Sequence, residues 1–436
     1  MSYGLIELGS IKPFGWSRSG RLQAVRDWRL NLLVQAVAGE AVARQCETDR
    51  RRDRHGSDPF SFAVSPCDRR KDYFDRFRHR NMLQTAIVGL GNVATWHRRG
   101  LERTPGSRLT AVVDVDESVA RERAAEWGVS SHTDLEDLFA EESVDWVHVC
   151  TPVATHADVA IQCLRAGAHV LVEKPVTATR EEFASLVETA DEVGLRATVV
   201  HNQAFYAPFL RARALIASRR FGRLHGVSVR WLENNDPREP GRGDWVLDLP
   251  GGEFGEGIVH PIYVGLRSAG YPAGEDAVDI KRVNTTDDPT VEYDGIAVSY
   301  RTDSDVTCTI QHHSNVQGRR QVEFFADEGR VVADIPTQTI RVYPEGYGPN
   351  ATVERPMLNA AYWTARNAAS VARSVASIRA RQALADLQDG DVTVHDTHTP
   401  VIRREVNAIE GTGSGPTPRE EADWTNRIYT MVNEAV

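Results

Sequence analysis

The sequence predicts an α/β domain with a doubly wound parallel sheet, followed by an α+β domain with an open, mainly antiparallel sheet. Two observations support this fold class. Between residues 83 and 201, short apolar runs alternate with helical segments, which is typical of parallel strands joined by helices. Between residues 224 and 343, several runs alternate apolar and polar residues, which indicates antiparallel strands with one wetter face.

Length and composition indicate a globular protein of more than one domain. The 436 residues suggest two domains with an appendage, and 41% of them are hydrophobic and 26% charged. We divide the chain into residues 1–81, 82–202 and 203–436. The sequence contains no run of about 18 apolar residues, which argues against a membrane-spanning helix.

Charge is unevenly distributed along the chain. Residues 1–81 hold 16 basic and 10 acidic residues, whereas residues 82–436 hold 35 basic and 51 acidic ones. A negative main body argues against nucleic acid or an anionic membrane as a partner. The five cysteines are scattered and form no CxxC motif, so we expect free thiols, a cytoplasmic location and no metal site.

The first 81 residues differ from the rest of the chain. They lack a sustained hydrophobic period, and residues 48–55 and 68–81 are runs of mixed charge. Such runs are typical of disordered tails, and a basic arm is the functional alternative. Because a clear strand begins just after Met82, residues 1–81 are also interpreted as spurious upstream sequence.

A glycine turn follows the first predicted strand, Leu83–Val88. Residues 89–94 read GLGNVA, a G-x-G-x-x-A pattern, and a helical segment continues to about Arg103. The first glycine permits a tight turn, the second lets a pyrophosphate approach the backbone, and Ala94 lets the helix pack against the strand. The pattern predicts a Rossmann dinucleotide site. Its phosphate-binding residues would be Gly89, Gly91, Asn92 and Val93.

An acidic residue stands where this fold binds the adenosine ribose. The second predicted strand, residues 109–113, ends at Asp114, which is 23 residues after Gly91 and near the usual spacing of about 20. An aspartate there accepts hydrogen bonds from both ribose hydroxyls and repels a 2′-phosphate. The sequence therefore predicts NAD, with NADP less favoured. Capping of the next helix is the alternative role of Asp114.

The alternation continues with strands over residues 145–150, 168–172 and 196–201, and with helices over residues 116–127, 134–141, 156–166 and 179–193. In doubly wound sheets, ligands bind outside the carboxyl ends of the strands. Thr151-Pro152 and Glu173-Lys174 fall at two of these ends. We expect both pairs at the cofactor site.

Three segments together resemble the Gfo/Idh/MocA family, which comprises glucose–fructose oxidoreductase, inositol 2-dehydrogenase and their relatives. They are GLGNVA at 89–94, TPVATH at 151–156 and AGAHVLVEKP at 166–175. The resemblance covers about residues 83–436, and AGxHVLxEKP is its most specific piece. It implies an NAD(P)-dependent oxidoreductase acting on a hydroxyl of a sugar, cyclitol or sugar derivative. It also implies that His156 lies near the cofactor, with capping and packing as alternative roles.

The resemblance assigns the reacting groups as well. The family's EKP lysine, which lies near nicotinamide and substrate and is often followed by a cis peptide bond, corresponds to Lys174. Residues 251–260 read GGEFGEGIVH, in which His260 matches the family's catalytic histidine. Glu256 stands where an aspartate is usual, and Tyr263 where a further aspartate is common. These two departures leave the fine substrate geometry open, and they retain the pair formed by Lys174 and His260.

The oxidation of an alcohol explains why a histidine and a lysine are needed at this site. Oxidation of a secondary alcohol releases a hydride, which nicotinamide takes, and a proton, which a positioned base must take. Histidine does this at its ordinary pKa, whereas a protonated lysine stabilises charge on the substrate oxygen. We assign the first role to His260 and the second to Lys174, and the reverse assignment stays open. If its segment is helical, Glu256 shares a face with His260 and could orient the imidazole or contact a substrate hydroxyl.

The second domain is predicted to begin with a linking helix over residues 202–218, and the chain ends in helices over residues 360–387, 400–409 and 418–436. Between these parts, residues 234–257 form a long polar loop. Loops of this length are usually functional or disordered, and we interpret this one as facing the substrate. The candidates for substrate contact are Asn202, Arg242, Asp244 and Trp245.

Two other functions stay open at this point. Some relatives in the family sense a nucleotide or sugar without catalysis, and others use tightly held NAD in an internal redox cycle. The presence of both Lys174 and His260 favours an oxidoreductase. We expect a sugar-like small molecule as substrate, and a homodimer or homotetramer formed through the second sheet.

Overall fold

The computed structural model describes residues 82–236, 251–286, 291–344 and 396–435, together with isolated positions between these ranges. Residues 1–81 lie outside the described residues, as do Arg242, Asp244 and Trp245. Most of the predicted helix over residues 360–387 lies outside them too.

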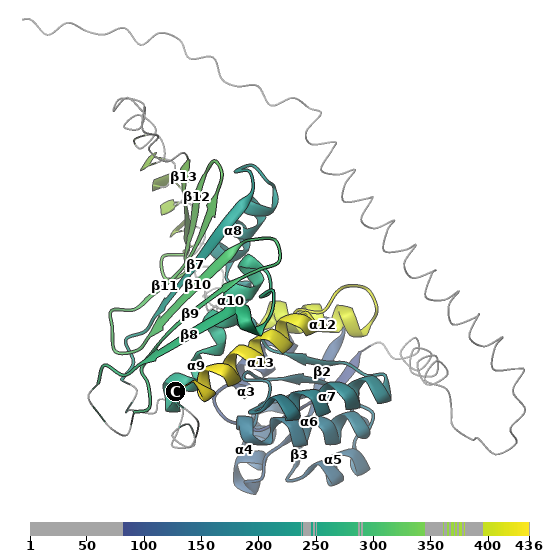
Figure 1. The fold of residues 1–436 in the computed structure, drawn as a ribbon. Coiled ribbons are helices and arrows are strands. Elements are labelled where there is room, and N and C mark those ends of the chain that lie inside the picture. Colours follow the sequence, from purple (N-terminus) through teal and green to yellow (C-terminus); the bar gives the residue numbers. More distant parts are fainter. Residues whose placement is uncertain are drawn as a thin grey trace, which may run out of the picture. The chain divides into compact units, whose positions relative to one another are not determined.

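The first sheet has six strands, and every neighbouring pair is parallel. Its order is β3-β2-β1-β4-β5-β6, so the winding direction reverses between β1 and β4. Figure 1 shows this sheet and its helices in the lower part of the view. The strands are β1 (Leu83–Val88), β2 (Ser107–Val113), β3 (Ser130–His132), β4 (Trp146–Val149), β5 (His169–Val172) and β6 (Ala197–Val199). The predicted doubly wound sheet is confirmed. Strand β3 was not predicted, because its three residues are polar and too few for a hydrophobic pattern.

Helices cover both faces of this sheet, which explains its continuous apolar strands. One face packs against α3 (Ala94–Glu102), α4 (Glu117–Trp127) and α12 (His398–Ile409). The other packs against α5 (Leu135–Glu141), α6 (His156–Arg165) and α7 (Arg180–Val193). Because α12 packs directly against α3, the end of the chain returns to the first sheet.

The second sheet has seven strands in the order β13-β12-β11-β7-β10-β9-β8. They are β7 (Leu224–Leu232), β8 (Val278–Val283), β9 (Gly295–Arg301), β10 (Thr307–His313), β11 (Arg319–Ala326), β12 (Gly329–Asp334) and β13 (Thr339–Pro344). Only the β7–β10 pair is parallel. The predicted, mainly antiparallel sheet is therefore confirmed.

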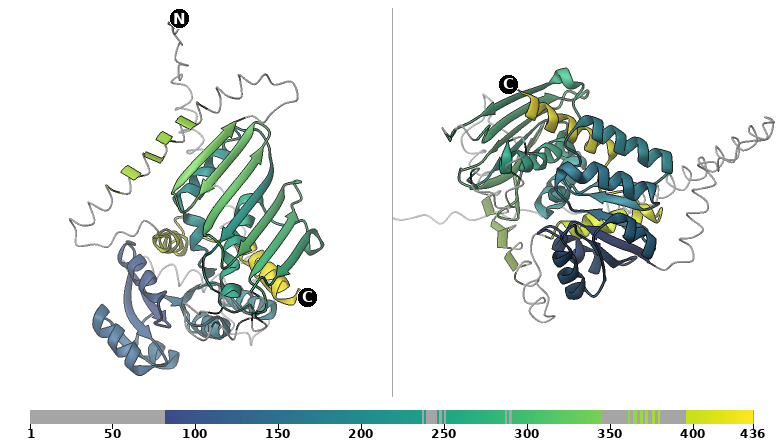
Figure 2. Two further views of the ribbon diagram at one scale, coloured as in Figure 1. Left: turned by 90° about the vertical axis from the view of Figure 1, so that its left-hand side faces the viewer. Right: turned by 90° about the horizontal axis from the view of Figure 1, so that it is seen from below.

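The two faces of the second sheet differ in polarity. Helices α8 (Ala207–Ala217) and α10 (Val259–Ala269) pack against one face, and α13 (Arg419–Glu434) packs against α10 and β8. Along β10, Cys308, Ile310 and His312 are buried, whereas the alternating Thr307 and Thr309 are exposed. The left view of Figure 2 shows the strands of this sheet from the side opposite these helices. The alternation is the one predicted from the sequence.

The prediction of one continuous helix over residues 202–218 is wrong, because the segment is divided in two. A 3₁₀ turn, η2 (Asn202–Phe205), precedes α8, and Tyr206 between them has a ψ of 130°. Pro208 has no N–H to donate to the carbonyl of Ala204, so a continuous helix would lose a hydrogen bond there. A new helix begins instead, with the proline in its first turn, where no such bond is needed.

The predicted loop over residues 234–257 is also wrong at its end. Residues Gly252–Gly257 form α9, and α10 follows directly after Ile258. Glycine and proline are unfavourable in a helix interior. The glycines of α9, together with Pro261 of α10, therefore concealed the helical pattern of this segment. Pro261 lies in the first turn of α10, where proline is tolerated. This helical segment carries Glu256 and His260.

Candidate active site

The glycine turn between β1 and α3 has the shape that a pyrophosphate needs. Gly89 has a φ of +86°, and a Cβ there would lie 2.7 Å from the backbone of Cys150 and Thr151. At Gly91 a Cβ would meet nothing within 4 Å, and both Gly91 and Asn92 are exposed. Ala94 is fully buried against the sheet. Space is therefore open beside Gly91, while the strand and helix on either side are closely packed.

No side chain of α3 itself compensates the partial positive charge at its N-terminus. Val93 makes no capping hydrogen bond through its side chain, and the first turn of α3 holds no acidic residue. The N–H groups of Ala94 and Trp96 donate to the Gly91 and Val93 carbonyls, and the helix dipole favours an anion at this end. Gly89, Gly91, Asn92 and Val93 thus fit the phosphates of a dinucleotide.

Asp114 lies next to this turn at the end of β2. Its Oδ2 accepts a hydrogen bond from the Leu90 N–H at 2.8 Å, and its Oδ1 accepts one from the Asp116 N–H at 3.0 Å. Each carboxylate oxygen has a further lone pair for a ribose hydroxyl. Asp116 caps α4 by accepting from Ser118 and Val119. Asp116, and not Asp114, is therefore the cap of this helix.

His156 connects two of the strand ends that we expected at the cofactor. The Nδ1 of His156 lies 2.8 Å from the Pro175 carbonyl oxygen, and its Nε2 lies 2.7 Å from the Thr151 carbonyl oxygen. Its ring is 1% exposed, and burial lowers its pKa. Both nitrogens face backbone oxygens, so His156 holds Thr151-Pro152 and Lys174-Pro175 together. The Lys174–Pro175 peptide bond is cis, as the resemblance implied.

Lys174 pairs with Glu256 at the junction of the two sheets. Its Nζ donates to the Oε1 of Glu256, and the two side chains are only 11% and 5% exposed. The lysine follows β5, whereas the glutamate lies on α9, 82 positions later in the chain. Two of the residues predicted to be catalytic are thus in contact.

His260 is oriented by a residue to which the sequence had assigned no role. Its Nδ1 lies 2.8 Å from the hydroxyl of Tyr263, one turn later on α10. That hydroxyl also accepts from the Gln203 N–H at 3.1 Å and donates to the Oδ1 of Asn202 at 3.4 Å. Burial raises the pKa of Tyr263 well above its usual value, so the hydroxyl keeps its hydrogen.

Tyr263 was missed because it counted only as a departure from the family pattern. A helical spacing of three residues from His260, with a hydroxyl able to reach an imidazole, is the signal that could have identified it. Asn202 lies in the same hydrogen-bonded group, with its Nδ2 3.5 Å from the Nε2 of His398, and its contact with substrate stays a prediction.

Glu173, predicted to contact the cofactor, lies in a buried cluster beside Lys174. Its Oε1 lies 2.9 Å from the Nε2 of His97 and 3.4 Å from the Nε2 of His398. Burial would raise the pKa of this carboxyl, but hydrogen bonds from His398 and His97 hold it well below its usual range. Its Oε2 accepts from the Lys174 N–H at 3.1 Å. Glu173 therefore holds the backbone of Lys174, and its contact with the cofactor stays a prediction.

The ligand atoms of His97, Glu173 and His398 lie within 4.8 Å of one another, so they could hold a cation. We expected no metal site from the sequence, and this group was not found there, because its members come from α3, the end of β5 and α12. The 2.9 Å separation of His97 and Glu173 is that of an ordinary hydrogen bond, which accounts for the pair without an ion.

Comparison with known proteins covers both sheets. Residues 83–201 match the family described as "Oxidoreductase family, NAD-binding Rossmann fold", and residues 209–332 match the "GFO/IDH/MocA C-terminal domain". Myo-inositol 2-dehydrogenase of Thermotoga maritima is 25% identical over 61% of this chain and 79% of its own length. 4-carboxy-2-hydroxymuconate-6-semialdehyde dehydrogenase of Sphingobium is 33% identical, but over 28% of this chain and 39% of its own length.

The fold is also found in solved structures. The WlbA dehydrogenase of Bordetella pertussis, in complex with NADH and UDP-GlcNAcA, has a TM-score of 0.63 and 17% identity. That match covers 82% of this chain and 97% of the dehydrogenase. At this identity the similarity establishes the arrangement of the two sheets.

Proposed function

Since the chain belongs to the GFO/IDH/MocA family of NAD-binding oxidoreductases, we propose that it is an NAD-dependent dehydrogenase of a sugar or cyclitol hydroxyl. The observation that carries this proposal is the pairing of Lys174 with Glu256, one helical turn before His260. This arrangement places a cation and a carboxylate at the carboxyl end of β5, with an imidazole one turn further along the helical segment that carries the carboxylate. Polyhydroxylated substrates need such groups for proton transfer and for hydroxyl recognition.

The relatives support the substrate class. The alignment with myo-inositol 2-dehydrogenase covers 79% of that enzyme and 61% of this chain, whereas the semialdehyde dehydrogenase is aligned over 39% of its length. The UDP-GlcNAcA bound to the WlbA dehydrogenase is a sugar derivative as well. We therefore favour a cyclitol or a sugar derivative as substrate.

The hydrogen bonds of Tyr263 support His260 as the proton acceptor. When the tyrosine donates its single hydrogen to the Oδ1 of Asn202, its oxygen is left to accept from the Nδ1–H of His260, whereas a hydroxyl that donates to the Nδ1 selects the other tautomer. In a neutral imidazole with hydrogen on Nδ1, the Nε2 carries the free lone pair. The Nε2 is then able to take the proton of a substrate hydroxyl.

Lys174 would act as the electrostatic partner. Its ammonium, held by Glu256, can donate to the substrate oxygen and stabilise the charge that develops as the proton leaves. Gly89, Gly91, Asn92 and Val93 would hold the pyrophosphate of NAD and Asp114 its adenosine ribose, while nicotinamide supplies the hydride acceptor. Asp114 selects against NADP by repelling a 2′-phosphate.

The test is cofactor binding combined with turnover. We expect saturable binding of NAD in preference to NADP, and oxidation within a panel of inositols, sugars and nucleotide sugars. Lys174→Met and His260→Asn should lose most turnover and keep NAD affinity. His225→Asn, at an exposed pair with Asp327, is the matched control. Failure to bind either nucleotide would refute the proposal, and NAD released only on denaturation would indicate an internal redox cycle.

Two further features of the proposed enzyme follow from the sequence. We infer that the chain forms a homodimer or homotetramer through the second sheet, and sedimentation of the full chain would test this. We also infer a cytoplasmic location. Within the described ranges, no helix is both long enough and apolar enough to cross a membrane.

A further inference from the structure

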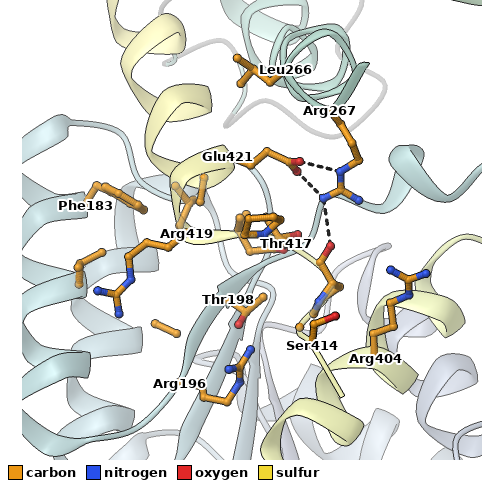
Figure 3. Close-up of a pocket in the computed structure, with 18 of the residues that line it drawn as sticks. Phe183, Arg196, Thr198, Leu266, Arg267, Arg404, Ser414, Thr417, Arg419 and Glu421 are labelled. Carbon is orange, nitrogen blue, oxygen red and sulfur yellow. Dashed lines mark hydrogen bonds and ion pairs between the residues drawn. The ribbon is translucent and has the colours of Figure 1, made fainter. Parts of the chain in front are cut away.

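A cavity separate from the glycine turn lies between the two sheets. Its volume is about 670 Å³, and its walls come from α7, β6, α8, α10, α12 and the segment that leads into α13 (Figure 3). One side is apolar and includes Phe183 and Leu186 of α7. This volume is within the range of about 300–1,000 Å³ that is common for sites of small organic molecules.

Five arginines line the cavity, although the main body of the chain is acidic. They are Arg196, Arg213, Arg267, Arg404 and Arg419. Three of them are neutralised by carboxylates: Arg196 by Glu405 at 2.7 Å, Arg267 by Glu421 at 2.6 Å and Arg419 by Asp191 at 2.6 Å.

Arg213 and Arg404 are different. Neither makes a hydrogen bond or ion pair with any residue in the described ranges, and each guanidinium lies over a ring, Phe209 at 5.7 Å and Phe205 at 5.0 Å. The guanidinium of Arg267 lies 5.4 Å from the same Phe205 ring. Burial, followed by the nearby positive charge of Arg267, lowers the pKa of both Arg213 and Arg404. Like charges are thus held near one another, and neither of these two guanidinium groups has a carboxylate in contact among the described residues.

We propose that this cavity binds a small organic phosphate, with Arg213 and Arg404 as the groups that recognise its charge. A phosphate monoester carries about −1.5 to −2 charges at pH 7, which matches two guanidinium groups without a carboxylate partner. The planar fork of arginine suits phosphate oxygens. Figure 3 shows Arg267 and Arg404 on the same side of the segment that carries Ser414 and Thr417. The apolar wall beside α7 would contact the organic part.

The cavity is connected to the candidate active site through hydrogen bonds. Arg267 of the cavity wall binds Glu421, whose Oε1 lies 2.7 Å from the Nδ1 of His201. His201 stacks on Tyr263 with 4.1 Å between ring centroids, and Tyr263 orients His260. A phosphate at Arg404, whose guanidinium shares the Phe205 ring with that of Arg267, would compete with Glu421 for Arg267 and change the hold of Glu421 on His201. The ligand would therefore alter turnover, a consequence that rests on the proposed function.

Binding is tested by calorimetric titration of the full chain with phenyl phosphate at fixed ionic strength, with and without saturating NAD. We expect one saturable site that is present in both conditions. Arg213→Gln and Arg404→Gln should each weaken it at least tenfold. Arg419→Gln removes the same charge from a lining residue that Asp191 already neutralises, so its affinity should match that of the wild type.

Equal weakening in all three variants would show general charge screening and would overturn the proposal, as would the absence of saturable binding in the wild type. A change of oligomeric state in Arg404→Gln would show that a second copy, rather than a small molecule, occupies the cavity. Arg404→Lys keeps the charge without the fork and provides a second variant if the glutamine variant fails to fold. Because the titration needs neither NAD nor turnover, its result does not depend on the dehydrogenase assignment.

The connection is tested by measuring kcat and KM with and without phenyl phosphate. We expect kcat to change at least twofold in the wild type and to stay constant in Arg404→Gln. An unchanged kcat in the wild type, despite saturable binding, would overturn the connection to His260.

Discussion

The role of Tyr263 gives the most specific prediction about the site. Tyr263→Phe keeps the fully buried ring and its stacking on His201, and it removes only the hydroxyl. Three groups then lose their partner: the Gln203 N–H, the Nδ1 of His260 and the Oδ1 of Asn202. The variant therefore removes the orientation of the imidazole without creating a large cavity.

The magnitude follows from those lost bonds. A buried polar group left without its partner costs about 1–3 kcal/mol, and three groups are affected, so we expect a loss of at least about 3 kcal/mol in the free energy of unfolding. The imidazole also loses the hydrogen bond that orients it at Nδ1. We expect kcat to fall about 10- to 100-fold, which corresponds to about 1.4–2.7 kcal/mol of transition-state stabilisation, with little change in NAD affinity.

The assay compares kcat, NAD affinity and urea unfolding with those of a matched variant. Tyr300→Phe removes another buried hydroxyl, which donates to the Gly270 carbonyl at 3.1 Å and lies on β9, away from the proposed catalytic groups. It should lose stability and keep its kcat. If both variants lost kcat equally, or if Tyr263→Phe kept full turnover, the orienting role would be refuted.

Three further predictions concern other parts of the molecule. Asp114→Ala should weaken NAD binding by tenfold or more and NADP binding much less, because only the ribose hydroxyls depend on the carboxylate; equal losses in a fluorescence titration would contradict this. Glu256→Gln removes the charge that holds Lys174 and should lower turnover about tenfold without unfolding the chain, as circular dichroism would check. Burial lowers the pKa of His169 to about 3 and the pKa of His312 to about 4, below the ordinary histidine value of 6.5. Below pH 6.5 the unfolded chain takes up a proton at each of these histidines, whereas the folded chain keeps the rings neutral. The stability that the neutral rings contribute is therefore complete above pH 6.5 and is lost as the pH falls towards 4. The loss is about 2 kcal/mol per ring at pH 5. Urea unfolding at pH 8 and pH 5 should show a smaller difference in His312→Gln, and an unchanged difference would exclude this cause.

The first sheet was predictable because local patterns determine it. Leu83–Val88 has the predicted bounds, and the helix expected from residue 179 begins at Arg180 with Thr179 as its cap. A capping box, in which Thr179 and Glu182 satisfy each other's N–H groups, lies within four consecutive residues. Such signals are complete within a short stretch of sequence, so no tertiary contact is needed to read them.

The site was predictable only where a motif marks it. Lys174 and His260 follow from motifs, and so does the presence of an acid at Glu256. The buried partners of Glu173 do not, because His97 and His398 are contributed by α3 and α12, far apart in the sequence. Helix α10 was missed for a related reason. The glycine-rich α9 that precedes α10 and Pro261 within it oppose a helix locally, and packing against β7, β10 and α13 stabilises α10.

The last helices of the chain connect the two halves of the candidate site. On α12, His398 contacts Glu173, whose carboxylate holds the backbone of Lys174. On α13, Glu421 binds His201, against which Tyr263 stacks. Lys174 follows β5 of the first sheet, whereas Tyr263 and His260 lie on a helix that packs on the second. The relative position of the proposed acid–base groups therefore depends on side chains from the end of the sequence, which contains none of the motifs that identify the reaction.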